Sequence, residues 1–200
     1  MDAVKRREFL NVPNYISLGR IVSVPLIVVF MMFINDYSEH HIWNATWSFI
    51  TALIYGLSSL SDMVDGFLAR RSKIEGSFGK FFDPVADKLL NLAAMIMLIP
   101  LHRIPAWLVV LILVREIVIT MLRGVAANEQ IVIPASKWGK YKNAFGSFGL
   151  AFMILHYRHF GVNWMMVGWV LFLVSATFSI GSGIHYVWKF IREISKDKGV

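Results

Sequence analysis

Long runs of apolar residues alternate with short polar segments along the whole chain. A helix that spans the hydrocarbon core of a bilayer needs about 20 mostly apolar residues. Because a backbone in lipid must satisfy its own hydrogen bonds, helices are the structure expected for these runs. The fold class predicted is therefore an all-α integral membrane protein. Six spanning helices are predicted, at residues 14–34, 45–70, 81–100, 105–126, 142–158 and 162–190.

The composition supports this class. Hydrophobic residues make up 56% of the 200 residues, charged residues make up 16%, and the mean hydropathy is +0.58, whereas soluble domains usually carry about 25% charged residues. Cysteine is absent, which excludes a disulfide framework, a thiolate nucleophile and a cysteine metal site. No linker is long enough to divide the chain, so residues 1–200 are expected to form one membrane domain. Residues 1–13 are interpreted as a cytoplasmic amphipathic lead-in and not as a cleaved signal.

The basic residues fall almost entirely on one side of the predicted spans. The opposite loops hold only Arg103 and Arg158. By the positive-inside rule the basic side is the cytoplasm, which also places both termini there. The net charge of +7 then reflects topology and attraction to anionic lipid, and no nucleic-acid partner is expected. The residues on the basic side are Lys5, Arg6, Arg7, Arg70, Arg71, Lys73, Lys80, Arg123, Lys137, Lys140, Lys142, Lys189, Arg192, Lys196 and Lys198.

Four aspartates interrupt the apolar pattern where the second span ends and the third begins. Asp62 and Asp65 are three residues apart, and Asp83 and Asp87 are four apart, so each pair shares one face of its helix. At 1.5 Å per residue, Asp62 lies about 12 Å inside the second helix. If the third helix starts near Gly76, its two acids lie about 10 and 16 Å inside it. Two antiparallel helices joined by a short cytoplasmic turn would bring all four carboxylates to one depth.

Clustered carboxylates in a poorly solvated site need cations to remain ionised. A ligand set made only of carboxylates favours hard divalent ions such as Mg²⁺ or Mn²⁺. Four aspartates are enough for two such ions, and a metal pair suits the displacement of phosphoryl groups. Gly66, Ala69 and Gly79 add little bulk beside the acids, which would allow close helix approach or let a flat ligand reach the backbone.

Simpler interpretations exist for each of these residues alone. Asp83 followed by Pro84 is a common start of a helix, with the acid as the N-cap. Asp62 could pair with Arg70 or Lys88 across the two helices, and the glycines could serve packing only. The combination of four acids, two glycines and a common depth favours the metal site over these interpretations.

Acidic residues inside a membrane also occur along the ion paths of cation transporters. A transporter would place them near the middle of the bilayer, often on discontinuous helices. Here they lie toward the cytoplasmic side beside a basic loop, which fits an anionic nucleotide better.

The same residues stand at the spacing of a known family signature. The pattern is Asp62-x2-Asp65-Gly66-x2-Ala69-Arg70-x8-Gly79-x3-Asp83-x3-Asp87, and it resembles the signature of the CDP-alcohol phosphotransferases at every fixed position. Segments 11–26, 113–127 and 136–142 are also similar to the bacterial phosphatidylglycerophosphate synthases of that family. The resemblance covers most of the chain. It implies a six-helix membrane fold, a homodimer, a bacterial inner-membrane location, and an active site that opens to the cytoplasm and inner leaflet.

The resemblance also implies roles for the motif residues. The four aspartates would bind two divalent cations, Mg²⁺ or Mn²⁺. Asp87 would in addition take the proton from the acceptor hydroxyl. The nucleotide contacts implied are Asp65, Gly66, Ala69, Arg70 and Gly79.

The reaction implied is attack by an alcohol on the lipid-side phosphorus of CDP-diacylglycerol, with release of CMP. The acceptor expected is glycerol 3-phosphate. Inositol phosphate, serine and phosphatidylglycerol are alternative acceptors within the same reaction class.

Glycerol 3-phosphate would need cationic side chains beyond the metals. Arg115 lies within an apolar run, where an unpaired arginine is costly, and Glu116 is predicted to be a poor partner because adjacent residues point about 100° apart. Arg123 lies eight residues on, on nearly the same face and about 12 Å nearer the cytoplasm. Arginines favour bidentate phosphate contacts. The acceptor-phosphate residues predicted are Arg115, Arg123, Lys137, Lys140 and Lys142.

These basic residues could also be structural and not bind a substrate. The lysines could reflect topology only, and the two arginines could form structural ion pairs. Many glycerophosphate enzymes follow the lysine motif with Thr and, three residues later, Gln, whereas this chain has Asn143 and Gly146 there. That departure bears on the choice of acceptor and not on the reaction class.

Overall fold

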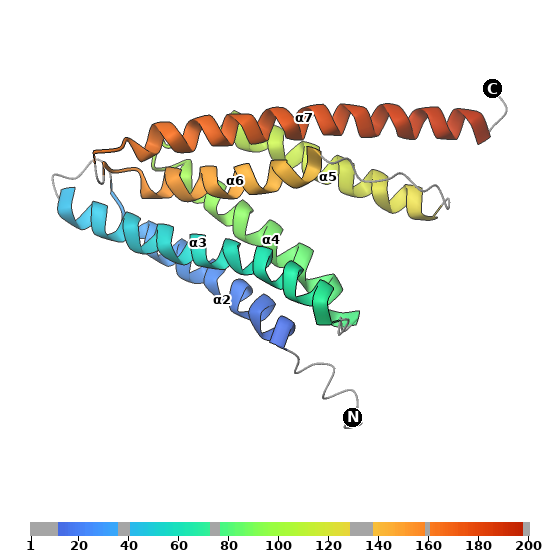
Figure 1. Ribbon diagram of the computed structural model, residues 1–200. Coiled ribbons are helices and arrows are strands. Elements are labelled where there is room, and N and C mark those ends of the chain that lie inside the picture. The colour runs from blue at the N-terminus through green and yellow to red at the C-terminus, as the bar shows by residue number, and fades with distance from the viewer. Residues whose placement is uncertain (1–11, 36–40, 73–76, 129–137, 159–160, 198–200) are drawn as a thin grey trace.

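The computed structural model describes the backbone of residues 12–35, 41–72, 77–128, 138–158 and 161–197. Side chains are described for residues 18–35, 41–61, 85–126, 141–158 and 161–193. Six helices occupy these ranges (Figure 1). They are α2 (Val12–Met32), α3 (His41–Ser72), α4 (Ser77–Leu98), α5 (Ala106–Asn128), α6 (Trp138–Leu155) and α7 (Trp164–Asp197).

Each predicted span coincides with one helix, so the all-helical prediction is confirmed. Several helices are longer than the predicted spans, because a helix continues for as long as its backbone hydrogen bonds are made, whatever the polarity of its side chains. Thus α3 starts at His41, four residues before the predicted span, and α7 runs to Asp197. That these helices cross a membrane stays a prediction.

Successive helices run up and down, so α2 begins and α7 ends toward the same end of the bundle (Figure 1). The end where α3 finishes and α4 begins, and where α5 finishes and α6 begins, is called the site end. The opposite end, where α4 finishes and α5 begins, is called the far end. Toward the site end, α2, α3 and α4 diverge from α5, α6 and α7 (Figure 1).

In the described part of α3, several polar residues are inside and several large apolar residues are outside. Asn44, Ser48 and Thr51 are buried, at positions that follow one helical face. Ile42 is 85% exposed and Leu57 is 59% exposed. This is the reverse of a soluble helix, in which the apolar stripe faces the core.

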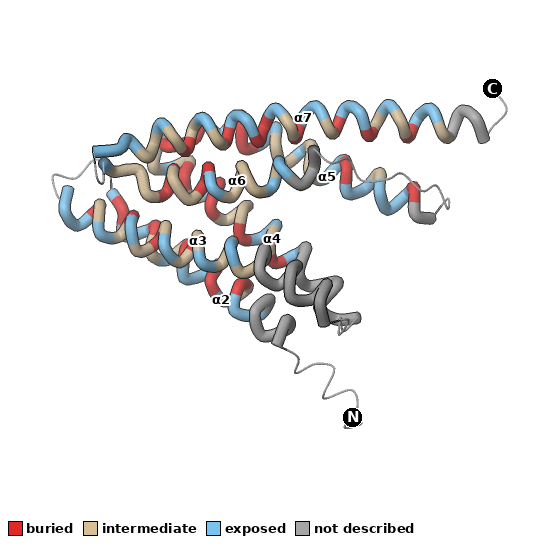
Figure 2. The backbone as a smooth tube through the Cα atoms, in the orientation of Figure 1, coloured by how far each residue is buried: buried red, intermediate tan, exposed pale blue. Residues whose placement is uncertain are grey.

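Large apolar side chains are exposed on all the helices, and the buried positions face inward (Figure 2). Met32 is 72% exposed, Met121 is 67% exposed and Met166 is 66% exposed. Soluble monomers rarely expose contiguous apolar patches larger than a few hundred Å². An outer surface of this kind is suited to lipid.

Judged by length and composition alone, one helix among the described residues, Trp164–Glu193 of α7, is long and apolar enough to cross a membrane. A shorter apolar helix covers Leu18–Met32. α3 falls short because of polar residues, three of which the bundle buries, and α5 because of the charged residues Arg115, Glu116 and Arg123. Average hydropathy is therefore a poor guide to helices that hide polar groups from lipid.

The closest helix packing is between α6 and α7, and glycines make it possible. A Cβ atom at Gly149 would lie 2.8 Å from the backbone nitrogen of Phe172. A Cβ atom at Gly168 would lie 2.8 Å from the backbone nitrogen of Met153. Because backbone atoms cannot move aside as a side chain can, both positions require glycine for this approach. α6 in turn packs against α3, which ties the α6–α7 pair to the helix that begins the acid motif.

Candidate active site

The acid motif is carried by the last turns of α3 and the first turns of α4. Asp62 lies ten residues before the end of α3 at Ser72, and Asp87 lies ten residues after the start of α4 at Ser77. At 1.5 Å per residue both are about 15 Å from the helix ends. Asp65 is seven residues from the end of α3 and Asp83 is six from the start of α4. Since α3 and α4 are in contact, the backbone is consistent with the common depth that the sequence predicts.

The structure describes the side chain of Asp87 but not those of the other motif residues. The predicted roles of these residues in metal and nucleotide binding therefore stay predictions. The motif side chains outside the described residues are those of Asp62, Asp65, Gly66, Ala69, Arg70, Gly79 and Asp83.

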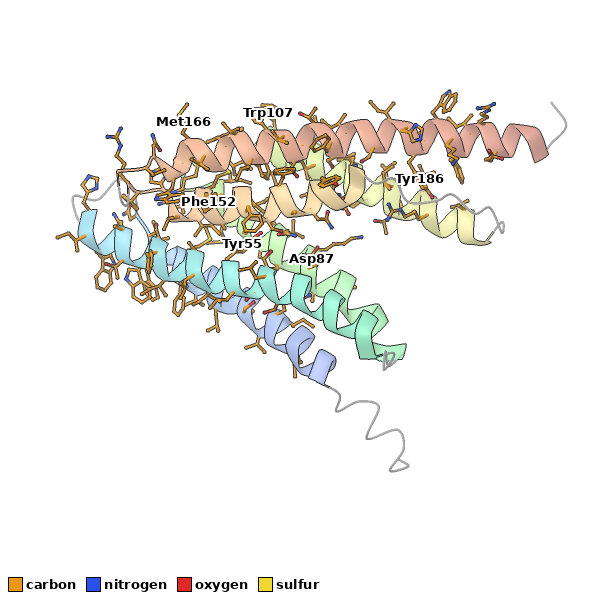
Figure 3. All side chains as sticks on the ribbon, in the orientation of Figure 1. Tyr55, Asp87, Trp107, Phe152, Met166 and Tyr186 are labelled. Carbon is orange, nitrogen blue, oxygen red and sulfur yellow. The ribbon has the colours of Figure 1, made fainter. Side chains whose placement is uncertain are left out.

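Asp87 is half-buried and is held by a side chain from the next turn of α4. The side-chain amide of Asn91 donates from Nδ2 to Asp87 Oδ1 at 3.2 Å. Asn91 Oδ1 in turn accepts a hydrogen bond of 2.5 Å from the hydroxyl of Tyr55 on α3. Tyr55 is fully buried, and Figure 3 shows it on α3 close to Asp87 on α4. Neither Tyr55 nor Asn91 was identified from the sequence.

Lys88, the neighbour of Asp87, is directed toward α5. Its Nζ donates to the hydroxyl of Thr120 at 3.0 Å and lies 3.9 Å from Glu116 Oε1. The described partners of Lys88 are thus on α5. To pair with Asp62 instead, Lys88 would have to break its contacts with Thr120 and Glu116.

Glu116 is the meeting point of basic residues from three helices, here called the Glu116 cluster: Glu116, Arg115, Lys88 and Lys142. Lys142 Nζ lies 2.8 Å from Glu116 Oε2, and Arg115 Nη1 lies 3.0 Å from the same oxygen. The prediction that Glu116 is a poor partner for Arg115 is therefore wrong. Adjacent Cβ atoms do point apart on a helix, but both side chains are long enough to bend back and meet.

Arg115 is also anchored to α7. Its Nε donates to the carbonyl oxygen of Ser179 at 2.8 Å, and its Nη2 donates to the hydroxyl of Ser182 at 2.8 Å. Gly183 leaves room for it, since a Cβ atom there would lie 3.1 Å from Arg115 Nε. Three of the five N–H groups of the guanidinium are thus taken by protein oxygens.

The Glu116 cluster carries more positive than negative charge. It holds three cationic side chains from α4, α5 and α6 around one carboxylate. Lys142 and Arg115 are mostly buried, with side-chain exposures of 17% and 15%. Arg123 lies two turns farther toward the site end, with its guanidinium over the ring of Tyr186 at 5.6 Å. The arrangement can attract and hold an anion such as a phosphate.

Of the predicted acceptor-phosphate residues, the structure brings Arg115 and Lys142 together on Glu116. It places Arg123 against α7, at Tyr186 (labelled in Figure 3). Lys137 lies outside the described residues, and Lys140 lies in α6 with its side chain outside them.

Gly146 has a structural explanation in this chain. A Cβ atom there would lie 2.8 Å from Ser175 Oγ. That hydroxyl donates to the backbone carbonyl of Lys142 at 2.6 Å. A long residue such as glutamine at position 146 would require Ser175 to move away from this carbonyl. The departure from the family pattern is therefore matched by close packing between α6 and α7.

The described residues are compatible with a divalent cation at Asp87. Its described side-chain contact is a neutral amide, which orients the carboxylate without cancelling its charge. The nearby cation Lys88 is engaged on α5. Among the described side chains no three His, Asp, Glu or Cys residues converge, and the other three acids of the motif lie outside that set.

Comparison with known proteins covers nearly the whole chain. A family model described as CDP-alcohol phosphatidyltransferase matches residues 10–180. A protein of Rickettsia typhi named CDP-diacylglycerol–glycerol-3-phosphate 3-phosphatidyltransferase is 33% identical over 177 residues, which are 88% of this chain and 94% of that protein. A protein of Bacillus subtilis with the same name is 32% identical over 182 residues, 90% of this chain and 94% of that protein.

A protein of Mycobacterium tuberculosis named probable phosphatidylglycerophosphate synthase is 32% identical over 192 residues, which are 94% of this chain and 86% of that protein. These similarities extend across all six helices and are not confined to the acid motif. With the family model matched over residues 10–180 and relatives above 30% identity over most of both sequences, the chain belongs to the CDP-alcohol phosphatidyltransferase family.

Proposed function

We propose that this protein transfers the phosphatidyl group of CDP-diacylglycerol to glycerol 3-phosphate, giving phosphatidylglycerophosphate and CMP. The observation that carries the proposal is the acid motif, with Asp62 and Asp87 each ten residues from the joined ends of α3 and α4. The relatives named for this reaction match the chain over most of its length, which supports the choice of donor and acceptor.

The site end would face the cytoplasm, with the bundle in a bacterial inner membrane and both termini on the cytoplasmic side. Two observations support this location. The outer surface of the bundle is apolar on every helix. Most basic residues of the described helices lie toward the site end, with Arg103 and Arg158 at the far end. A homodimer is expected from the family resemblance.

Asp62, Asp65, Asp83 and Asp87 would hold two divalent cations, Mg²⁺ or Mn²⁺. Bound there, the cations would neutralise the diphosphate and its leaving oxygen, which is the main requirement of phosphoryl-group displacement. Gly66, Ala69 and Gly79 would leave space for the cytidine, and Arg70 would contact the nucleotide together with Asp65.

Asp87 would act on the acceptor. Its carboxylate would accept the proton of the attacking hydroxyl as the new bond to the lipid-side phosphorus forms and the bond to the CMP oxygen breaks. The Glu116 cluster, with Arg123, Lys137 and Lys140, would bind the phosphate of the acceptor. Its excess of positive charge suits a dianion, and Lys88 links it to α4, the helix that carries Asp87.

A direct assay tests the proposal. Purified protein in lipid nanodiscs is given CDP-diacylglycerol and Mg²⁺ with one acceptor at a time: glycerol 3-phosphate, inositol phosphate, serine or phosphatidylglycerol. We expect CMP release with glycerol 3-phosphate, and its loss in Asp87→Asn but not in the control Glu193→Gln, which removes a carboxylate outside the motif. Release only with another alcohol would reassign the acceptor. No release of CMP with any of the four acceptors would refute the proposed enzymatic activity.

A further inference from the structure

Asp87 is connected to the middle of the bundle by two side chains that are not part of the acid motif. Asn91 donates to its carboxylate at 3.2 Å, and Tyr55 donates to Asn91 at 2.5 Å. A line of hydrogen bonds therefore runs from Tyr55 on α3 through Asn91 to the carboxylate on α4.

The direction of these hydrogen bonds fixes the direction of the Asn91 amide. An ionised carboxylate only accepts hydrogen bonds, so the NH₂ group of the amide must face Asp87. The oxygen of the amide then faces Tyr55, whose hydroxyl donates to it. Without this donor the amide would lose the contact that holds its oxygen, and its direction would no longer be fixed. Tyr55 thus supports the group that donates to Asp87.

The Asn91 donor to Asp87 is neutral. An amide orients a carboxylate and leaves its charge in place, whereas a lysine donor would cancel that charge. Lys88 is drawn to Thr120 and Glu116 on α5. The contribution of Asn91 is therefore a fixed orientation of the carboxylate, as a metal ligand or a proton acceptor requires.

Burial gives Tyr55 and its hydrogen bond to Asn91 a defined geometry. Tyr55 is 0% exposed and belongs to the buried core that also contains Leu90 and Ala94 of α4. A ring enclosed in this way has little freedom to move, so its hydroxyl is a fixed reference point for the amide. Residues that support a ligand from behind typically matter almost as much as the ligand.

We propose that Asn91 and Tyr55 are positioning residues that hold the Asp87 carboxylate in its working orientation. The inference rests on the proposed function for the role of Asp87 as cation ligand and proton acceptor. Tyr55 and Asn91 could also bond to each other only because both are buried polar groups that need partners. The experiment must therefore separate the positioning of Asp87 from this purely structural pairing.

The variants are Tyr55→Phe, Asn91→Leu and the double variant. Tyr55→Phe removes one oxygen from a buried ring, which keeps the packing of α3. The control is Thr51→Val, because Thr51 is a buried hydroxyl one turn away on α3 that donates only within its own helix, to the Trp47 carbonyl at 2.7 Å. Each protein is measured in nanodiscs for kcat, for KM of both substrates, and for thermal stability.

We expect Asn91→Leu to lower kcat by about 10- to 100-fold, the range typical of residues that support a metal ligand. Tyr55→Phe should lower kcat by about threefold to tenfold, because the amide keeps its place but not its fixed direction. KM for CDP-diacylglycerol should change little in both, and Thr51→Val should keep the kcat of the unmodified protein. The double variant should be no slower than Asn91→Leu, because Tyr55 acts only through Asn91.

A second measurement does not depend on turnover. Mn²⁺ is titrated into each protein without substrates, and the free ion is followed by electron paramagnetic resonance. Asn91→Leu should weaken Mn²⁺ binding by about 10-fold or more, and Thr51→Val should leave it unchanged. If the unmodified protein released no CMP with any acceptor, the proposed function would fail, but this titration would still test the positioning of Asp87.

Three results would overturn the positioning role. One is a kcat and Mn²⁺ affinity of Asn91→Leu equal to those of the unmodified protein. Another is a double variant slowed by the full product of the two single effects, which would make Tyr55 independent of Asn91. The third is a loss in Tyr55→Phe that Thr51→Val reproduces, with both explained by lower stability.

Discussion

Arg103 and Arg115 are both held inside the bundle, and their surroundings differ. At the far end Arg103 is 1% exposed, donates to the carbonyl of Ile154 at 2.7 Å and to the hydroxyl of Ser48 at 3.2 Å, and lies over the ring of Tyr157. These contacts join the loop before α5 to α3 and α6. Arg103 therefore closes the end of the bundle.

Arg115, near the middle of α5, belongs to a group with surplus charge. It shares Glu116 with Lys142 and Lys88, so among the described side chains three cations surround one carboxylate. Such a surplus of positive charge favours the binding of an anion. The comparison teaches that the balance of charge around a buried arginine, more than burial alone, separates an arginine that serves the fold from one that serves a ligand.

Removal of the far-end arginine should have the largest effect on stability. Arg103→Met keeps the apolar stem but leaves the Ile154 carbonyl and the Ser48 hydroxyl without this donor, which should lower the free energy of unfolding by about 3 kcal/mol. The free energy of unfolding is measured in mixed micelles by circular dichroism. Arg158→Met, an exposed arginine at the same end, is the control. Lost activity with unchanged stability would reverse the assignment of Arg103.

The matching change in the Glu116 cluster should act on substrate and less on stability. Arg115→Met is expected to raise KM for glycerol 3-phosphate about tenfold, or about 1.4 kcal/mol, with KM for CDP-diacylglycerol within about twofold. Both KM values are obtained from initial rates measured while the concentrations of the two substrates are varied. The comparison breaks down if Arg115→Met is as unstable as Arg103→Met and binds the acceptor normally.

Glu116→Gln tests the carboxylate that gathers the cations. The amide keeps a similar shape but loses the charge, so Arg115, Lys142 and Lys88 should move apart. We expect KM for glycerol 3-phosphate to rise about threefold to fivefold, with a loss of stability below about 1 kcal/mol. The difference in KM between Glu116→Gln and the unmodified protein should shrink at high salt, because salt screens repulsion between partly exposed charges. Tighter acceptor binding would instead mean that Glu116 only competes with the acceptor.

The smallest effect is expected from a single methyl group. Gly183→Ala places a Cβ atom 3.1 Å from Arg115 Nε, so the guanidinium must shift by a few tenths of an ångström. KM for glycerol 3-phosphate should rise about twofold to threefold, since misplacement of binding groups lowers rates steeply. Gly181→Ala, on the same helix with no atom near the added Cβ, should change nothing. Equal behaviour of the two variants would remove Arg115 from the acceptor site.

The sequence predicted the six helices because apolar length and helical rise are properties of single segments. The equal depth of Asp62 and Asp87 could be predicted for the same reason, since it depends only on where two helices end. Asn91 could have been identified too, because it lies one turn from Asp87 on the same face. Tyr55 could not, because its contact depends on how α3 is rotated against α4.

The error at Glu116 has a different origin. The angle between neighbouring side chains on a helix describes Cβ atoms, and it no longer determines where the charged ends of long side chains lie. Both Arg115 and Glu116 are long enough to turn toward Lys142. Similarly, Gly146 looked like a departure in the acceptor motif until its contact with Ser175 showed a packing reason.

The length of α3 has a consequence for the lipid substrate. Its 32 residues make a rod of about 48 Å, and the hydrocarbon layer is about 30 Å thick. With the far end of α3 at one surface of that layer, about 18 Å of the helix would emerge on the other side. Asp62, about 15 Å from the end of the helix, would then lie near the level of the lipid phosphates. A lipid could be joined to its new headgroup there without lifting its acyl chains out of the leaflet.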